Sequence, residues 1–234
     1  MKSTIQNKDK LVNSVFSKVY KNYDLMNDIM SLGIHRIWKE KFMDWMGSLK
    51  NKDLIDVASG TGDIAKLFLK KSGNTGRIVC VEPNINMLEQ GKKRLGENNV
   101  IKWINANAEN IPVEDNSFDF YTISYGIRNV SDINKSLKEA FRVLRPGGRI
   151  MCLEFSKIDN EILNFLYKQY SKAIPQIGKL IVGSDKPYKY LIDSIDKFYG
   201  QKELVELIEN AGFSNIQFRN LSNGISAIHS GWKI

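Results

Sequence analysis

Cysteine, proline and long apolar runs are scarce in this sequence. The two cysteines, Cys80 and Cys152, lie in short apolar runs of strand character, so we expect buried free thiols rather than a disulfide or a metal site. The 234 residues include five prolines and 17 glycines and no low-complexity tract, which argues against disorder. Length and a hydrophobic content of 42% suit one large domain.

No apolar stretch is long enough to span a bilayer, and the polar residues 1–10 lack the apolar core of a secretory signal. We therefore expect a cytoplasmic protein. The formal net charge of +8 gathers in two segments: residues 1–50 carry nine lysines and arginines against five acids, and residues 157–202 carry eight against five. These segments either face an anionic surface, such as lipid or nucleic acid, or are ordinary solvated lysines.

Apolar residues at helical spacing predict helices over 11–30 and 36–49, with no strand before them. From residue 53 onward, short buried strands alternate with amphipathic helices. Strands are expected at 53–58, 77–82, 100–105, 118–124 and 149–155, and helices at 64–71, 85–95 and 132–144. This alternation predicts a doubly wound, mostly parallel α/β sheet that is covered by helices on both faces.

The alternation stops after Phe155. An apolar helical stripe over 162–174 is expected to end at Pro175, because proline interrupts the backbone hydrogen bonds of a helix. The loop that is expected to follow contains Gly178, Gly183 and Pro187.

A helix over 202–211 and a hairpin of two strands, at 214–219 and 224–229, close the chain. With the five earlier strands they predict a seven-stranded sheet whose last strands are antiparallel. We interpret the chain as a single domain. Its expected parts are an N-terminal helical cap at 1–50, a sheet core at 51–156 and 200–234, and a substrate-side insertion at 157–199.

The first strand leads into a glycine-containing turn, residues 56–63 (DVASGTGD). Gly60 and Gly62 let a ligand approach the backbone, and the helix that follows offers free N–H groups at its start. The spacing of Gly60, Gly62 and Ala65 also satisfies the dinucleotide pattern. Glu82 stands where that pattern expects a ribose-binding acid, so an NAD-dependent oxidoreductase is one alternative.

Other features favour S-adenosylmethionine (SAM) as the ligand. Asp56 and Asp63 flank the turn, where they would repel a pyrophosphate and attract a sulfonium and an α-amino group. Glu82, at the end of the second strand, can accept two hydrogen bonds from ribose hydroxyls. A polar loop, 107–112, follows the third strand, where an adenine edge needs a partner. The antiparallel closing hairpin is also unusual in a dehydrogenase.

Longer sequence blocks make the pattern more specific. They are 23–28 (YDLMND), 35–39 (HRIWK), 56–63, 107–109 (NAE), 123–130 (ISYGIRNV), 144–148 (LRPGG), 153–156 (LEFS), 175–178 (PQIG), 188–191 (YKYL) and 227–232 (AIHSGW). With these blocks the chain resembles, from about Val15 on, the ubiquinone/menaquinone biosynthesis C-methyltransferase family of Rossmann-like class I SAM-dependent methyltransferases. It departs from the family pattern at Ser59, where a second glycine is usual, and at Pro187, where a serine is common.

The resemblance implies that SAM is the cofactor and that it binds along the carboxyl edge of the sheet. The implied contacts are Thr61, Glu82, Asn107, Ala108 and Ser124, beside the turn residues Asp56, Gly60 and Gly62. The resemblance also implies methylation of a ring carbon of a polyprenylated quinol. That quinol is 2-polyprenyl-6-methoxy-1,4-benzoquinol or demethylmenaquinol, in ubiquinone or menaquinone biosynthesis.

Methylation of a ring carbon requires an electron-rich ring, which loss of a phenolic proton supplies. Arg128 and Asn129 follow the fourth strand at the carboxyl edge, where Arg128 can stabilise the phenolate or polarise a water that takes the proton. Tyr23, from the first helix, can line the pocket. The alternatives are that Arg128 pairs with an acid to hold its loop and that Tyr23 packs in the core. No cluster of metal ligands is evident in the sequence, and methyl transfer requires none.

The polyprenyl tail needs an apolar surface. The stripe over 162–174 and the first helix are the expected groove, unless the stripe is simply core. Basic residues beside it suggest peripheral contact with the inner membrane or with a quinone-synthesis complex, and a homodimer is left open. We expect no nucleic-acid partner, because no RNA-binding module and no interleaved aromatic and basic residues occur. Another small-molecule or RNA methyltransferase, or a non-catalytic binding subunit, is the alternative within this fold.

Overall fold

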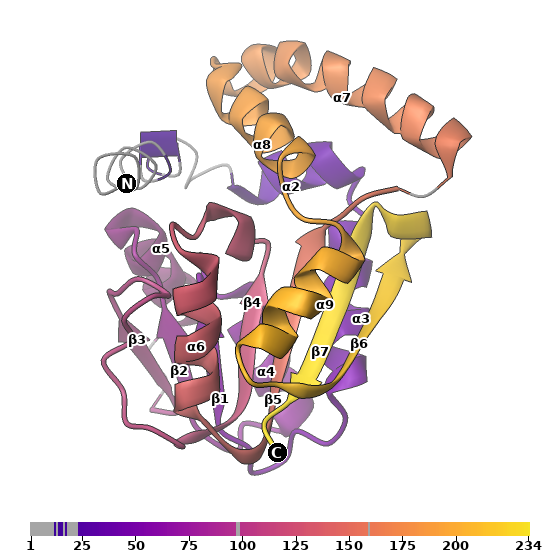
Figure 1. Cartoon of the computed structure of the whole chain (residues 1–234). Helices are drawn as coiled ribbons and strands as arrows, with labels where there is room; N and C mark the ends of the chain where they lie inside the picture. The colour runs from indigo at the N-terminus through magenta and orange to yellow at the C-terminus, as the bar shows by residue number, and fades with distance from the viewer. Residues whose placement is uncertain (1–11, 13, 16, 18–22, 97–98, 159) are drawn as a thin grey trace.

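A computed structural model describes residues 12, 14–15, 17, 23–96, 99–158 and 160–234. Its centre is one sheet of seven strands in the order β3-β2-β1-β4-β5-β7-β6 (Figure 1). The strands are β1 (Leu54–Val57), β2 (Ile78–Val81), β3 (Ile101–Ile104), β4 (Phe118–Ser124), β5 (Leu144–Phe155), β6 (Ser214–Leu221) and β7 (Ser226–Trp232). Neighbouring strands are parallel, except that β7 is antiparallel to β5 and β6. This arrangement confirms the predicted fold class.

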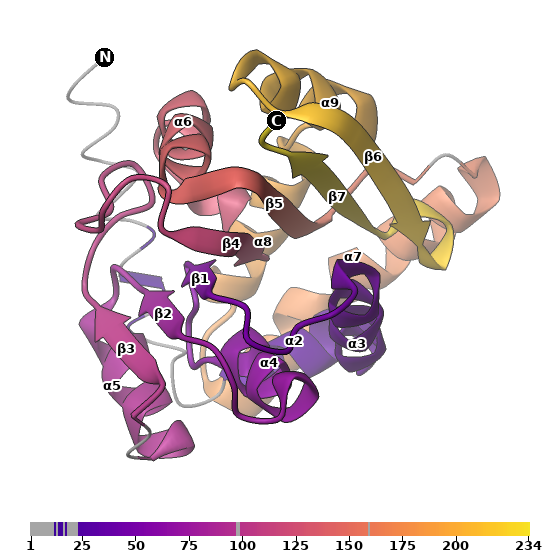
Figure 2. The same cartoon turned by 90° about the horizontal axis from the view of Figure 1, so that it is seen from below.

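Helices cover both faces of the sheet and its carboxyl end. They are α2 (Tyr23–Ser31), α3 (His35–Met46), α4 (Asp63–Ser72), α5 (Ile85–Leu95), α6 (Ile133–Val143), α7 (Glu161–Val182), α8 (Lys186–Asp196) and α9 (Gln201–Asn210). Helices α3, α4 and α5 lie on one face, and α6 and α9 lie on the other (Figure 2). Each face has its own apolar cluster, with Phe42 and Phe68 buried in one and Leu137 and Ile208 in the other. The core is therefore two layers of side chains separated by the sheet.

The strand order reverses between β1 and β4, and ligands of open α/β sheets bind where the carboxyl ends of such strands diverge. Helices α7 and α8 lie over this end of the sheet together with α2, which contacts α7 (Figure 1). The segment interpreted as a substrate-side insertion, 157–199, thus stands at the edge to which β1 and β4 point. Within the described residues, every helix is too short or too polar to cross a membrane.

Two predictions about this segment are wrong. Helix α7 does not end at Pro175 but continues past it. Tertiary packing outweighs the lost backbone hydrogen bond, because Ile174 is fully buried and a Cβ at Gly178 would lie 2.2 Å from the ring of Tyr188. The expected loop instead contains α8, with Pro187 in its first turn, where the missing N–H has no helical partner to lose.

Other boundaries differ less. The helix predicted over 11–30 lies partly outside the described residues, within which residues 12, 14, 15 and 17 are helical and α2 follows. Strand β5 already begins at Leu144, before the turn expected at 145–148, and its pairing with β4 shifts in register there. Cys80 and Cys152 are buried free thiols, as predicted.

Candidate active site

The turn between β1 and α4 forms one wall of the site. Its backbone is left-handed at Gly60 and Gly62, with φ values of 56° and 82°. A Cβ at Gly62 would lie 2.9 Å from Leu95 and 3.0 Å from Trp103. Glycine is therefore required at this position both by the backbone conformation and by the side chains packed behind the turn.

Glu82 follows β2 and ties this turn to the neighbouring strand. Its carboxylate accepts hydrogen bonds from the backbone N–H groups of Gly60 at 2.8 Å and Asn84 at 2.9 Å. Burial raises the pKa of Glu82 to about 7, although both hydrogen bonds lower it. Glu82 thus lies beside the turn as expected, and its contact with a ribose stays a prediction.

Asp63, the acid at the start of α4, is paired with two cations. Lys39 of α3 contacts one of its oxygens at 2.5 Å, and Arg94 of α5 contacts the other at 2.6 Å. Burial raises the pKa of Asp63, but the two cations outweigh burial and lower the pKa to about 2. Arg94 also donates to the hydroxyl of Thr61 at 2.9 Å. The ion cluster of Asp63, Lys39 and Arg94 therefore holds the turn between α3 and α5.

Asp56 is the second acid of the turn, and it points into the sheet region rather than to solvent. Its side chain is buried and accepts a hydrogen bond from Thr122 at 2.8 Å. Burial raises the pKa of Asp56 to about 7 even though Thr122 and Lys39 lower it. Asp63 is thus an ion-paired carboxylate and Asp56 a buried one. The attraction of a sulfonium or an α-amino group by these two acids stays a prediction.

A small cavity next to the turn is lined by polar groups. Its walls include Lys39, Asp56, Thr61, Asp63, Ser124 and Tyr125. Within the described part of the chain, Asp56 Oδ2 and Ser124 Oγ are buried without a hydrogen-bond partner. Such atoms require a polar ligand or a water. The amino-acid end of SAM is a polar ligand of this kind, so the unpaired polar atoms of the lining fit the chemistry of the cofactor that the resemblance implies.

The remaining predicted cofactor residues follow β3. Ala108 is buried in the apolar cluster of one face. Asn107 is exposed, and its carbonyl accepts the N–H of Asn110 at 3.2 Å. All eight predicted cofactor residues therefore lie at or just beyond the carboxyl ends of β1 to β4, and their binding roles stay predictions.

Arg128 lies in the 3-10 turn η2 (Ile127–Asn129) that follows β4. Its guanidinium pairs with the carboxylate of Glu154 on β5 and donates to the carbonyl of Tyr125 at 2.9 Å. Both charged side chains are buried, and burial raises the pKa of Glu154 although the charge of Arg128 lowers it. Arg128 therefore pairs with an acid, as one of the two alternatives from the sequence predicted. Its buried Nε–H has no partner among the described residues, so a catalytic role stays a prediction.

Polar groups of α7 and α8 converge on this loop. Tyr190 of α8 donates to Asn129 Oδ1 at 2.9 Å. The pKa of Tyr167, on α7, is raised by burial to about 12, although the nearby charge of Arg128 lowers it. Tyr23 begins α2, but its side chain lies outside the described residues, so its place in the pocket stays a prediction.

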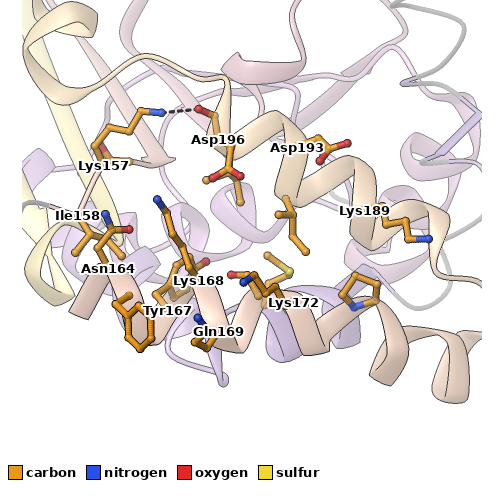
Figure 3. Close-up of a pocket in the computed structure, with 17 residues that line it drawn as sticks. Lys157, Ile158, Asn164, Tyr167, Lys168, Gln169, Lys172, Lys189, Asp193 and Asp196 are labelled. Atoms are coloured by element: carbon orange, nitrogen blue, oxygen red, sulfur yellow. Dashed lines mark hydrogen bonds between the residues drawn. The ribbon is translucent and has the colours of Figure 1, made fainter. Parts of the chain in front are cut away.

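A cavity of about 860 Å³ lies between α7 and α8 (Figure 3). Tyr167 and Lys168 border it from α7, and Asp193 and Asp196 border it from α8 (Figure 3). Lys157 donates to the carbonyl of Asp196 at 2.6 Å. Further wall residues are apolar: Met30, Ile158, Phe165, Pro175, Ile192 and Ile195. The volume is typical of a small-molecule pocket.

Comparison with known proteins decides between the alternatives. A family model described as the ubiE/COQ5 methyltransferase family matches residues 4–233. The chain belongs to this family. The ubiquinone/menaquinone biosynthesis C-methyltransferase UbiE of Rickettsia bellii is 50% identical over 234 residues, which cover 97% of this chain and 94% of that protein. The protein of the same name from Brucella abortus is 47% identical over 233 residues, with coverages of 97% and 87%.

Solved structures show the same fold. A SAM-dependent methyltransferase from Thermotoga maritima has a TM-score of 0.68 at 22% identity, over 95% of this chain and 100% of that chain. Phosphoethanolamine N-methyltransferase 2 of Haemonchus contortus, solved with S-adenosyl-L-methionine, has a TM-score of 0.64 at 15% identity, over 84% and 52% of the two chains. As a member of the ubiE/COQ5 family the chain is a SAM-dependent methyltransferase, so the NAD-dependent oxidoreductase alternative is wrong.

Sequence reasoning missed several polar groups of this ubiE/COQ5 site. Lys39 and Arg94 are distant in sequence from the turn that they hold, and Glu154 and Tyr190 are distant from the loop of Arg128. A signal did exist for three of them, because Lys39, Glu154 and Tyr190 fall inside blocks that carry the family resemblance. Arg94 lies in the last turn of α5, among basic residues that read as ordinary surface charge.

Glu82 makes the stability of this ubiE/COQ5 family member depend on pH. Its pKa is about 7 in the folded chain against an ordinary value of 4.5, so the native state keeps a proton that the unfolded chain has lost. The stabilisation is full below pH 4.5 and is lost as the pH rises to about 7, by at most about 3 kcal/mol. In urea unfolding across this window, Glu82→Gln is expected to show a smaller decline of the unfolding free energy.

The exposed Glu114→Gln variant is the matched control and should keep the wild-type slope. Burial also raises the pKa of Asp56, and this group contributes its own decline in all three proteins. The quantity to compare is therefore the difference between the variants in how steeply the unfolding free energy falls with pH. Equal slopes for Glu82→Gln and the wild type would contradict the raised pKa of Glu82.

Proposed function

We propose that this chain transfers a methyl group from SAM to a ring carbon of a polyprenylated quinol in ubiquinone or menaquinone biosynthesis. Its relatives from Rickettsia bellii and Brucella abortus carry the name of this activity, at 50% and 47% identity over nearly the whole chain. The structural observation that carries the proposal is a buried guanidinium, Arg128, whose Nε–H is unpaired within the described residues, in the loop that follows β4.

SAM, when bound, supplies an electrophilic methyl group on a sulfonium centre. The residues proposed to hold it are Asp56, Gly60, Thr61, Gly62, Glu82, Asn107, Ala108 and Ser124. They fix its position through backbone N–H groups, hydroxyls and carboxyls at one edge of the sheet. Positioning of this kind supplies much of the rate acceleration in a transfer between two bound molecules.

We assign the activation of the quinol to Arg128. The ring hydroxyl must lose its proton before the neighbouring ring carbon becomes nucleophilic. A guanidinium already held by Glu154 stabilises the resulting phenolate without reorganising. Asn129, fixed by its hydrogen bond from Tyr190, orients the hydroxyl or the water that takes its proton. Because Arg128 and Glu154 are buried, their charges act in a medium of low polarity, where such interactions are strong.

Replacing Arg128 by lysine tests this role. Lysine keeps a positive charge beside Glu154 but loses the planar fork of donors. We expect kcat for quinol methylation, measured by mass spectrometry of the product, to fall by about 10²–10³-fold. The dissociation constant for S-adenosylhomocysteine, measured by calorimetry, should stay within about threefold of the wild type, a difference of about 0.7 kcal/mol.

Arg142→Lys is the matched control, since Arg142 forms its ion pairs with Asp115 and Glu139 on the α6 side of the molecule. This variant should keep wild-type turnover. Parallel loss of turnover and cofactor affinity in Arg128→Lys, or unchanged turnover, would assign Arg128 to holding its loop only.

We also propose that α7 rests on an anionic bilayer, from which the polyprenyl tail enters the site. Ile162, Phe165 and Leu166 form one exposed face of α7, with 74%, 60% and 58% of their surfaces accessible. The exposed Lys168 and Lys172 lie on the following turns, where their charges can meet lipid phosphates. Phe165 and both lysines also border the cavity between α7 and α8, so the bilayer face and the cavity share a wall.

Vesicle sedimentation tests this contact. The wild type should bind vesicles that contain phosphatidylglycerol at low salt, and should bind less at high salt and to pure phosphatidylcholine. Phe165→Ser with Leu166→Ser should weaken binding by about 100-fold or more, because each side chain contributes about 1.5–3 kcal/mol of apolar burial. The control Ile37→Ser with Ile85→Ser changes exposed residues on α3 and α5 and should bind as the wild type does. Wild-type protein that ignores anionic vesicles at low salt contradicts the proposal.

A further inference from the structure

Two cations share one carboxylate at the start of α4. Lys39 Nζ and Arg94 Nη1 each contact a different oxygen of Asp63, at 2.5 and 2.6 Å. Arg94 alone satisfies Asp63 as an ion pair and also holds Thr61. Burial raises the pKa of Asp56, so this acid is a weaker partner for Lys39 than Asp63 is. Asp63 is therefore one carboxylate that is shared by two cations.

Of the two cations, Lys39 is the one that faces the cofactor cavity. Its side chain is buried, with 7% of its surface accessible against 30% for Arg94. Lys39 borders the cavity beside the turn, together with Ser124 and its unpaired hydroxyl. Burying a lysine ammonium is costly unless it is paired. A buried lysine whose acid already has a second partner is thus positioned for another anion.

We propose that Lys39 recognises the α-carboxylate of the methionine part of SAM. The inference rests on the proposed function, since it names a residue that binds the cofactor of that reaction. The chemistry matches, because the amino-acid end of SAM carries one carboxylate and one ammonium group. Lys39 is complementary to the carboxylate. When Lys39 turns to the ligand, Arg94 still pairs with Asp63, so no buried charge is left alone.

Through Lys39, helix α3 of the N-terminal helical cap becomes part of the proposed cofactor site. It lies on α3, whose neighbouring residues Trp38 and Phe42 are packed in the apolar core. The backbone that carries the ammonium is therefore fixed by core packing before any ligand arrives. A preorganised charge costs little ordering free energy when it binds its partner.

Calorimetric titration with SAM and with decarboxylated SAM, which lacks only the α-carboxylate, tests the inference without any turnover. The wild type should bind SAM about tenfold or more tightly than the decarboxylated compound. Lys39→Met should weaken SAM binding by a similar factor, leave binding of decarboxylated SAM within about twofold, and so abolish the preference. Lys39→Arg keeps the charge and should retain most of the preference.

Lys41→Met is the matched control, because it makes the same change at an exposed position of the same helix, and it should bind both compounds as the wild type does. Equal weakening for both compounds in Lys39→Met, or an unchanged preference for SAM, overturns the inference. If Lys39→Met does not fold, Lys39→Gln is titrated in its place. A wild type that binds both compounds equally overturns the inference but not the proposed function, whereas a wild type that binds neither overturns both.

Discussion

The parallel pairing of β1 with β4 is the constraint from which the site follows. Val57 lies opposite Ile123, so the segments after both strands leave the sheet at the same edge, where the strand order reverses. The turn that contains Thr61 and the strand end at Ser124 therefore line one cavity. The loop of Arg128 begins only a few residues later. Transfer between two bound molecules needs this adjacency, and backbone pairing supplies it before any side chain takes part.

Two ion clusters, of which the pair of Arg128 with Glu154 is buried, then fix the two halves of the edge. Arg128 with Glu154 holds the loop after β4 to β5, and Asp63 with Lys39 and Arg94 holds the turn after β1 between α3 and α5. Buried ion pairs add little net stability, since desolvation offsets their attraction. They do restrict geometry, because removing one partner leaves a charge uncompensated. These ion pairs, although costly to desolvate, thus hold the charges of the site in a single arrangement.

Much of this architecture could be predicted from local sequence. The alternation of short apolar runs with amphipathic helices predicted the sheet, and the turn at 56–63 and Glu82 predicted its functional edge, since both signals are local in the chain. The helix through Pro175 could not be predicted, because burial of its neighbours against α8 outweighs the local penalty of proline. The partners of Asp63 could not be predicted either. Lys39 and Arg94 lie far from the turn in sequence, so the residues around the turn do not indicate them.

The most direct measurement is the position of a labelled methyl group in the product. Purified protein is incubated with SAM that carries ¹³C in its methyl group and with demethylmenaquinol or the polyprenylated benzoquinol, and the product is examined by NMR. The account predicts the label on a ring carbon, at the chemical shift of a methyl group attached to an aromatic carbon. A label on a ring oxygen, or no transfer to either quinol by protein that binds SAM, would contradict it.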